Sequence, residues 1–425
     1  MTKRTKRHWL ELTLGITLAL AMGMTGDCDM PADPDMMPDD PMDNPDDGNP
    51  PALNIVKTDI DVHVGARVAA GDGIIAYGTG GFSGVDYIEV GDTAGRGVPN
   101  GANFLAKSFA VCGKKIIFIE NFLLTVFDTT DQSSSAIAMT DVRLTTVPAG
   151  LDGGGHIQCD GNFVATRNDA NIVTDGKQVK VVDVSNAVPN VVSFDVNPAA
   201  APEQVAVDAS NPHVAAVAND IIYVYDINDP TAAPQQFDLS GNDGINNDTQ
   251  IQFKNGIIFY KDNSTFGNAK LLDTSDGSIV TLDENPSAQT LGLNGGTYAY
   301  FLDRDNGDSF GTVNRSGVGD VPNAASTIAG DDRVTDGTDN NGFVGWAQTV
   351  AITPDGDMVF MAGSESIGQQ EWLMLSNGGS FNVLPDPDDA TADGLKASDV
   401  STSANTVGFK QGVNETTKLG YIDLE

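Results

Sequence analysis

Three aspartates in one short segment are the residues best suited to hold a metal ion. Asp303, Asp305 and Asp308 lie within the sequence DRDNGDSFG. Ca²⁺ binds carboxylate and carbonyl oxygens, which turns rich in Asp, Asn and Gly present close together. The pattern departs from an EF-hand, because Gly307 and Asn314 stand where that loop needs an oxygen ligand and a glutamate. Calcium binding is one interpretation of this segment, and a solvated acidic loop is the other.

A second group of polar residues stands just before a recurring strand. Its members lie one or two residues ahead of an apolar run: His156, Gln204, Gln250, Gln289 and Gln348. If these strands surround a channel, the side chains form a ring at one mouth and hydrogen-bond a ligand. The alternative is structural, with each side chain capping backbone groups of a neighbouring unit.

The three cysteines suit an exported chain. Cys28 follows the N-terminal apolar run closely, as the lipid-modified cysteine of a bacterial lipoprotein does. Asp27, directly before it, is a poor match to the small residue expected there. Lipidation of Cys28 and simple secretion therefore both stay open.

Cys112 and Cys159 are candidates for a disulfide. They lie in FAVCGKK and HIQCDGN, near the end of the same strand in neighbouring units. The alignment of the two units slips by one residue, which turns a strand side chain to the opposite face and counts against the pairing. Two buried free cysteines are the alternative.

Signatures of catalysis are missing from the sequence. It contains no HExxH, GxSxG or P-loop pattern. A triad of residues far apart in sequence would leave no such pattern, and nothing points to one. We assign no catalytic residue, and the sequence favours a binding protein over an enzyme.

The charge of the chain limits its partners. The formal net charge is −36, with 59 acidic and 23 basic residues among 425. Nucleic acids and anionic membranes bind clustered Lys and Arg, so neither is an expected partner. Only nine of the acidic residues are Glu, and the chain has 47 Gly and 20 Pro. Asp, Gly and Pro favour turns, so the composition predicts an all-β protein.

The N-terminal region predicts export. Residues 1–26 combine a basic start, MTKRTKRHW, with the apolar run LTLGITLALAMG and a small-x-small cleavage site. Residues 27–52 are rich in Asp and Pro and predict a disordered acidic tether. The folded domain is expected over residues 53–425. We expect a periplasmic, cell-surface or secreted protein with no transmembrane helix after processing.

The folded region repeats one pattern. Apolar strands that carry an acidic residue near their ends recur in VDYIEVGDT, LLTVFDTTD, VKVVDVSNAVP, IIYVYDINDPTAAP and AKLLDTSDGS. Ahead of each stands a strand, a tight turn and a second strand, as in QIQFKNGIIFY. Asn-Gly and Asp-Gly are typical of such hairpin turns.

The spacing of the repeat predicts a single β-propeller. The first strands begin near Val68, Phe109, Ile157, Val205, Ile251, Leu291, Val350 and Val400. A period of roughly 40 to 50 residues with about four short strands per unit is typical of propeller blades. We count eight blades, with seven as the alternative. A lone strand in 53–64 precedes the first unit, and we expect it to complete the last blade.

The repeats resemble those of known families. VKVVDVSNAVP and YVYDINDPTAAP resemble the unit of bacterial LVIVD-repeat propellers, and AITPDGDMVFM resembles the hairpin of YVTN-type and TolB-like propellers. The resemblance implies a secreted or envelope-anchored propeller that acts by binding, and it transfers no catalytic residue.

Three functions follow as hypotheses. The first is a non-enzymatic binding or scaffold module at the bacterial cell envelope, with a protein or glycan partner. The second is a metal-dependent hydrolase or lyase with its site in the channel. The third is a surface protein stabilised by calcium. We expect no organic cofactor, and Ca²⁺ is the one ion that the acidic loops suit.

Overall fold

The computed structural model describes most of the repeat region. The described residues are 53–63, 68–79, 84–99, 109–120, 123–137, 157–168, 177–196, 202–246, 251–264, 268–281, 287–294, 297–304, 310–317, 326–327, 350–352, 358–364, 370–377, 380–388, 394–403, 406–411 and 416–424. The predicted export signal, the tether and Cys28 lie outside these ranges, so they stay predictions.

The described strands form eight antiparallel sheets of four strands. Sheets 1 to 3 hold β2 (Val68–Ala70), β3 (Ile74–Gly78), β4 (Val85–Glu89), β5 (Arg96–Gly97); β6 (Phe109–Cys112), β7 (Lys115–Glu120), β8 (Leu123–Asp128), β9 (Ser133–Ala136); and β10 (Ile157–Asp160), β11 (Phe163–Arg167), β12 (Val179–Asp183), β13 (Asn190–Phe194). Sheets 4 and 5 hold β14 (Gln204–Asp208), β15 (His213–Ala218), β16 (Ile221–Asp226), β17 (Gln235–Asp238); and β18 (Gln252–Lys254), β19 (Ile257–Lys261), β20 (Ala269–Asp273), β21 (Ile279–Thr281).

The remaining sheets follow the same order. Sheets 6 and 7 hold β22 (Ser287–Asn294), β23 (Thr297–Arg304), β24 (Phe310–Gly317), β25 (Ser326–Thr327); and β26 (Val350–Ile352), β27 (Met358–Ser364), β28 (Gln370–Asn377), β29 (Ser380–Val383). Sheet 8 holds β30 (Ala397–Ser403), β31 (Thr406–Gln411), β32 (Thr416–Asp423) and, as its outermost strand, β1 (Asn54–His63).

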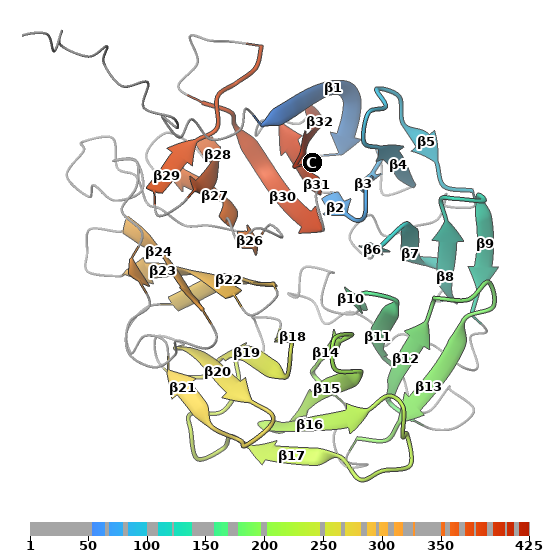
Figure 1. The fold of residues 1–425 in the computed structure, drawn as a ribbon, viewed down its shortest axis with the longest axis vertical. Coiled ribbons are helices and arrows are strands. Elements are labelled where there is room, and N and C mark those ends of the chain that lie inside the picture. Colours follow the sequence, from blue (N-terminus) through green and yellow to red (C-terminus); the bar gives the residue numbers. More distant parts are fainter. Residues whose placement is uncertain are drawn as a thin grey trace, which may run out of the picture. The chain divides into compact units, whose positions relative to one another are not determined.

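The sheets follow one another around a ring (Figure 1). The first strand of each sheet is innermost, and each inner strand contacts the inner strand of the next sheet. Strand β2 also contacts β30, so the ring closes between sheets 8 and 1. This arrangement is a β-propeller, as the repeat predicted, and the first strand of each sheet begins within four residues of a predicted unit start.

Strand β1 closes the ring from the N-terminal side. It pairs antiparallel with β32, with Asn54 opposite Asp423 and a bulge between Lys57 and Asp61. The predicted closing strand over 53–64 is therefore confirmed. The last sheet combines both ends of the folded chain: β1 is its outermost strand and covers the edge that β32 would otherwise leave unpaired.

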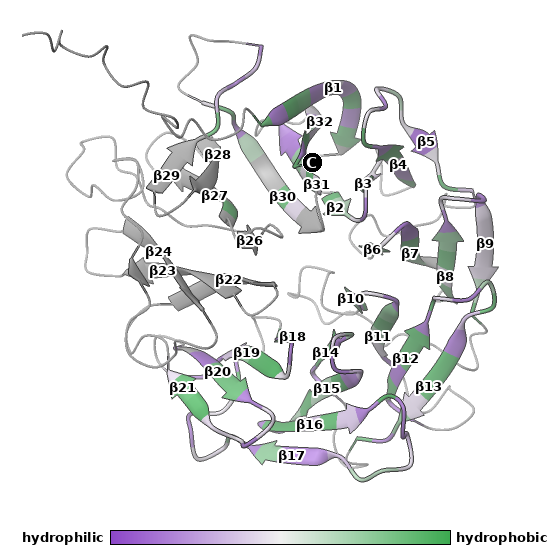
Figure 2. Cartoon of the chain, viewed as in Figure 1, coloured by the Kyte–Doolittle hydropathy of each residue, from purple (hydrophilic) through white to green (hydrophobic). Residues whose placement is uncertain are grey.

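The hydrophobic core lies between neighbouring sheets. Separate clusters of buried side chains fill the junctions of sheets 1 with 2, 2 with 3, 3 with 4, 4 with 5, 7 with 8 and 8 with 1. Val, Ile and Ala dominate these clusters, because β-branched and small side chains pack well on pleated strands. Figure 2 shows the hydrophobic residues within the strands and hydrophilic ones mostly at strand ends and turns.

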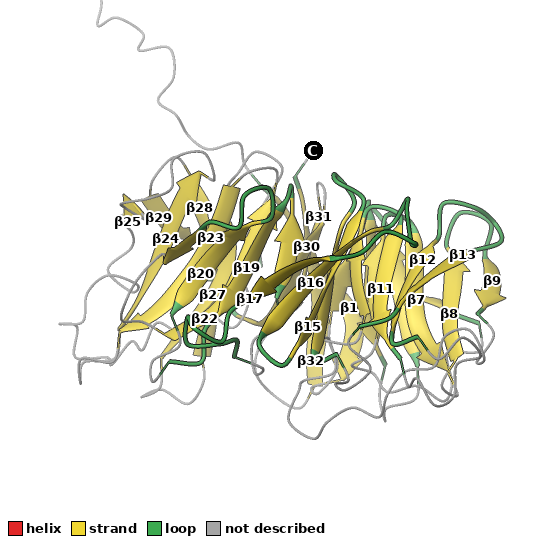
Figure 3. Ribbon diagram, turned by 90° about the horizontal axis from the view of Figure 1, so that it is seen from below, coloured by secondary structure: helices red, strands yellow, loops and turns green. Residues whose placement is uncertain are grey.

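Local turn chemistry explains why the hairpins form. Asn255 and Gly256 both have positive φ angles, 51° and 79°, between β18 and β19. Two consecutive positive φ values define the type I′ turn, which Asn-Gly favours and which matches the twist of a hairpin. Figure 3 shows the strands running between two faces on which these turns lie.

Among the described residues, no helix is long and apolar enough to cross a membrane.

Candidate functional site

One face of the propeller repeats a single carboxylate turn. We call it the hairpin face: it carries the turns from first to second strand and from third to fourth strand. In six of the eight described sheets the third strand ends on an acidic residue at this face: Glu89, Asp128, Asp183, Asp226, Asp273 and Asp423. The carboxylates of four accept a backbone N–H two residues later, at 2.9 Å for Asp128 and Asp183 and 2.8 Å for Asp226 and Asp273.

The residue after the carboxylate forms a backbone hydrogen bond that joins the turn to the first hairpin of the same sheet. Thr129 donates its N–H to the Lys114 carbonyl oxygen at 3.1 Å. The same bond, from third-strand end to first hairpin, recurs at 2.9 Å in four other sheets, where the donors are Val90, Val184, Ile227 and Thr274. The Asp in the repeat therefore has a structural reason: it caps a turn whose backbone is held to the first hairpin.

A second set of aspartates on this face stays ionised. Asp131, Asp229 and Asp276 lie in the turns from third to fourth strand. The Ser133 and Thr231 hydroxyls lower the pKa of Asp131 and Asp229 respectively, and the Ser278 backbone N–H lowers the pKa of Asp276. Hydrogen bonds to a carboxylate stabilise its charged form, so the hairpin face keeps its negative charge below the usual pKa range of Asp.

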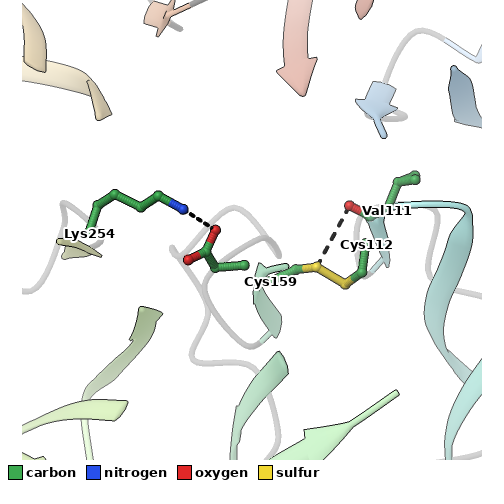
Figure 4. The surroundings of a disulfide bond; sticks show 5 residues. Val111, Cys112, Cys159 and Lys254 are labelled. Carbon is green, nitrogen blue, oxygen red and sulfur yellow. Dashed lines mark hydrogen bonds and ion pairs between the residues drawn. A yellow bond between two sulfur atoms is a disulfide. The ribbon is translucent and has the colours of Figure 1, made fainter. Parts of the chain in front are cut away.

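Side chains on this face also join neighbouring sheets. Asp160 accepts the Ala209 N–H of sheet 4 at 2.7 Å, and Asp208 accepts the Gly256 N–H of sheet 5 at 2.8 Å. Lys254 of sheet 5 reaches past sheet 4 to the other Asp160 oxygen, at 2.5 Å (Figure 4). These charges are committed to the ring and are not free for a ligand.

The structure places Cys112 and Cys159 together. They are joined as a disulfide between sheets 2 and 3, with 5.9 Å between their Cα atoms (Figure 4). The one-residue slip was wrongly counted against this pairing. Side chains that meet across a junction lie on opposite faces of their own sheets, so a shift of one residue brings them together.

Of the predicted ring of polar residues, Gln204 is the member whose side-chain contacts the structure describes. Gln204 is 1% exposed and lies between sheets 4 and 5. Its Oε1 accepts the Ile251 N–H at 2.7 Å, and its Nε2 donates to the Asn246 carbonyl at 3.0 Å. It therefore caps backbone groups, which was the structural alternative. Gln289 lies in β22, and His156, Gln250 and Gln348 lie outside the described residues.

The aspartates considered for calcium are only partly described. Asp303 lies within β23 opposite Gly311 of β24, so it belongs to a strand and not to the expected loop. Strands β23 and β24 pair as far as Arg304 and Phe310, so the strands extend into the Asp- and Gly-rich segment that was expected to be a loop. Asp305 and Asp308 lie outside the described residues. Within the described ranges, no group of three His, Cys, Asp or Glu is placed to hold a metal ion.

A polar groove on the hairpin face spans the closure of the ring. Its volume is about 590 Å³. Residues of sheets 8, 1 and 2 line it: Asp72, Gly73, Ile74, Glu89, Val90, Arg96, Lys114, Thr129, Thr130, Gln132, Thr406 and Asp423. Sequence patterns did not reveal this groove, because its residues come from three units and meet only in the closed ring.

The two cations of the groove differ in their surroundings. Arg96 donates to Glu89 at 2.6 Å and to Asp92 at 2.7 Å, and its guanidinium lies 6.0 Å from the centre of the Tyr87 ring. Lys114 is exposed, and within the described ranges its ammonium forms no ion pair. Arg96 is therefore fixed by the protein, whereas the Lys114 ammonium is available to a bound molecule.

Comparison with known proteins identifies the fold. The chain resembles the computationally designed Ika8 protein, with TM-score 0.53 and 14% identity over 86% of this chain and 100% of that one. It also resembles the WD40 domain of SCAP from fission yeast, with TM-score 0.51 and 10% identity over 88% and 98% of the two chains.

The propeller domain of the Trilobed protease from Pyrococcus furiosus aligns with TM-score 0.46 and 10% identity over 86% of this chain and 95% of that one. No protein-family model and no curated protein matches the chain. The fold is a β-propeller. At these identities the likeness shows the fold alone.

Proposed function

We propose that this protein is a non-enzymatic binding module of the bacterial cell envelope, whose hairpin face binds a basic segment of another envelope protein. The observation that carries the proposal is the repeated carboxylate of this face. Sheet after sheet presents an acidic residue at the same position, and the outer turns add further aspartates with lowered pKa. A rigid array of one sign attracts a partner of the other sign and speeds its encounter.

The proposed location is outside the cytoplasm. Residues 1–26 have the composition of an export signal, and Cys28 is in the place of a lipid-modified cysteine. A disulfide between Cys112 and Cys159 suits an oxidising compartment. The acidic tether would place the propeller at some distance from an anchor. Calcium at Asp303, Asp305 and Asp308 stays a proposal for the same protein.

A comparison of two charge-neutralising variants tests the face. The test variant carries Asp131→Asn, Asp229→Asn and Asp276→Asn. The control carries Asp195→Asn, Asp238→Asn and Asp243→Asn, which remove equal charge from the opposite face. Asn keeps an oxygen that can accept the turn hydrogen bonds, so both variants should fold. The probe is a Lys- and Arg-rich peptide, and its affinity for each variant is measured by titration calorimetry.

The expected result is a tenfold or greater loss of affinity in the test variant and a change of twofold or less in the control. Because the pKa values of these aspartates are lowered, wild-type binding should persist at pH values below the pKa of about 3.9 of an unperturbed Asp. Equal losses in the two variants would mean that net charge alone attracts the peptide, and the assignment to the hairpin face would be wrong.

Capture of partners complements this test. The tagged protein is cross-linked in intact cells and its partners are identified by mass spectrometry. An envelope protein with a basic segment, lost with the test variant and kept with the control, is expected. Recovery of the chain alone would favour a self-assembling surface protein instead.

A further inference from the structure

The groove between sheets 8, 1 and 2 differs in charge from the rest of the hairpin face. It contains Lys114 and Arg96 beside the carboxylates Asp72, Glu89 and Asp423. Two cations face three carboxylates, so the charges of the lining nearly cancel and the groove attracts a basic peptide less strongly than the surrounding acidic face does. The net charge of −36 disfavours an anionic ligand everywhere on the molecule. These two effects leave an uncharged ligand as the best electrostatic match.

The lining also excludes a mainly apolar ligand. Ile74 and Val90 are its only large apolar residues, and the Ile74 side chain is 2% exposed. The rest is an alternation of hydrogen-bond acceptors and donors: carboxylates, threonine hydroxyls, an amide from Gln132 and the Lys114 ammonium. A hydroxyl group both donates and accepts, so a ligand with many hydroxyls satisfies both kinds of group.

We infer that this groove binds a neutral oligosaccharide. Asp72 would accept hydrogen bonds from sugar hydroxyls, and Lys114 would donate to sugar oxygens. The volume of about 590 Å³ lies within the range of roughly 300–1,000 Å³ that is usual for small-ligand sites. This site goes beyond the proposed binding of a basic protein segment and uses different residues.

The groove is a composite of the ring closure. Thr406 and Asp423 belong to sheet 8, and Asp423 pairs with Asn54 of the closing strand as well as with Thr406. Asp72 and Glu89 belong to sheet 1, and Lys114 and Gln132 to sheet 2. The Asp72 N–H donates to the Gly113 carbonyl at 3.0 Å and fixes the first hairpins of sheets 1 and 2 against each other. The site is thus preformed once the ring is closed.

The test uses the whole folded protein and a panel of immobilised neutral, acidic and basic oligosaccharides. Retention of neutral oligosaccharides in preference to charged ones is expected. Titration calorimetry with the best-retained neutral oligosaccharide follows. Lys114→Ala and Asp72→Asn should each lower the affinity at least tenfold, and raising the salt concentration should leave wild-type affinity unchanged, because the ligand carries no charge.

Matched controls separate this inference from the proposed function. Lys177→Ala and Asp195→Asn make the same chemical changes on the opposite face and should leave sugar binding unchanged. The triple Asp variant of the outer turns should also keep it. The inference would be overturned by no retention of any neutral oligosaccharide, by preference for charged ones, or by full affinity in both groove variants. Lys114 and Asp72 are exposed, so thermal melts of these variants should match wild type.

Discussion

Gln204 shows how one buried amide holds two sheets together. Its oxygen and nitrogen each have a backbone partner in the segment that enters sheet 5, and the side chain is almost fully buried. Arg167 acts in the same way at the previous junction, where its guanidinium donates to the carbonyl oxygens of Pro202 and Glu203. Both side chains therefore satisfy backbone groups in the segment that enters the next sheet.

Replacing Gln204 by Leu tests that role. The Ile251 N–H and the Asn246 carbonyl would lose their partner in a buried place, which costs about 1–3 kcal/mol. We expect the free energy of unfolding, measured by urea denaturation, to fall by that amount. Gln235→Ala, on the exposed strand β17, is the control and should change it little. A stable Gln204→Leu protein with impaired ligand binding would instead support a ligand ring at the channel mouth.

At the scale of the element, β1 belongs to two junctions at once. Val62 packs in the cluster between sheets 8 and 1, and Leu53 and Ile55 pack against the cluster between sheets 7 and 8. The Lys57 ammonium lies 2.9 Å from an Asp386 oxygen and 3.1 Å from one of Asp388, on the segment that leaves sheet 7. The Thr58 hydroxyl donates to the Leu419 carbonyl oxygen, and the Thr417 hydroxyl donates to the Val62 carbonyl oxygen, each at 2.8 Å.

A chain that begins at residue 66 should therefore be much less stable than one that begins at residue 50. Loss of β1 uncovers Leu419 and Tyr421 and leaves β32 as an unpaired edge. We expect a lower melting temperature and concentration-dependent aggregation. A synthetic peptide of residues 53–64 should raise the melting temperature as its concentration rises, because it binds the folded chain. This role of β1 would be contradicted if the shorter chain melted at the same temperature as the longer chain and the peptide did not change that temperature.

The elements were predictable because their signals are local. Alternating apolar residues, Asn-Gly and Asp-Gly turns and the acidic residue that ends most third strands all act within one unit, so the blades and the closing strand could be found in the sequence. The contacts that join units could not. The bond between Lys254 and Asp160 and the groove around Lys114 link residues that approach each other only because the ring has a fixed curvature. The partner faces of Cys112 and Cys159 were misjudged for the same reason.

At the scale of the molecule, negative charge opposes folding. The formal charge of −36 is distributed over a ring whose hairpin face repeats carboxylates in several sheets. Buried lysines offset some of it: Lys270, with 6% of its surface exposed, lies 2.7 Å from the fully buried Asp262. The pKa of Asp262 is lowered despite its burial, because Lys270, Ser264 and Asn268 all donate hydrogen bonds to it. The exposed carboxylates repel one another through solvent, where dissolved ions can screen them.

Salt should therefore stabilise this protein. The Debye length falls from about 30 Å at 0.01 M to about 3 Å at 1 M, so added NaCl weakens repulsion between exposed carboxylates while buried pairs such as Lys270 and Asp262 are screened much less. We expect the melting temperature, measured by calorimetry, to rise by several degrees over this range, and an uncharged osmolyte to reproduce only part of the rise.

Calcium and magnesium at equal ionic strength separate screening from a specific site. An additional rise with calcium alone, lost in Asp303→Asn, would support calcium binding at that hairpin. Equal effects of the two ions would leave screening as the whole cause, because a selective site distinguishes them by size and ligand number. A melting temperature that falls with NaCl would show that attractive surface pairs outweigh the repulsion inferred from the net charge.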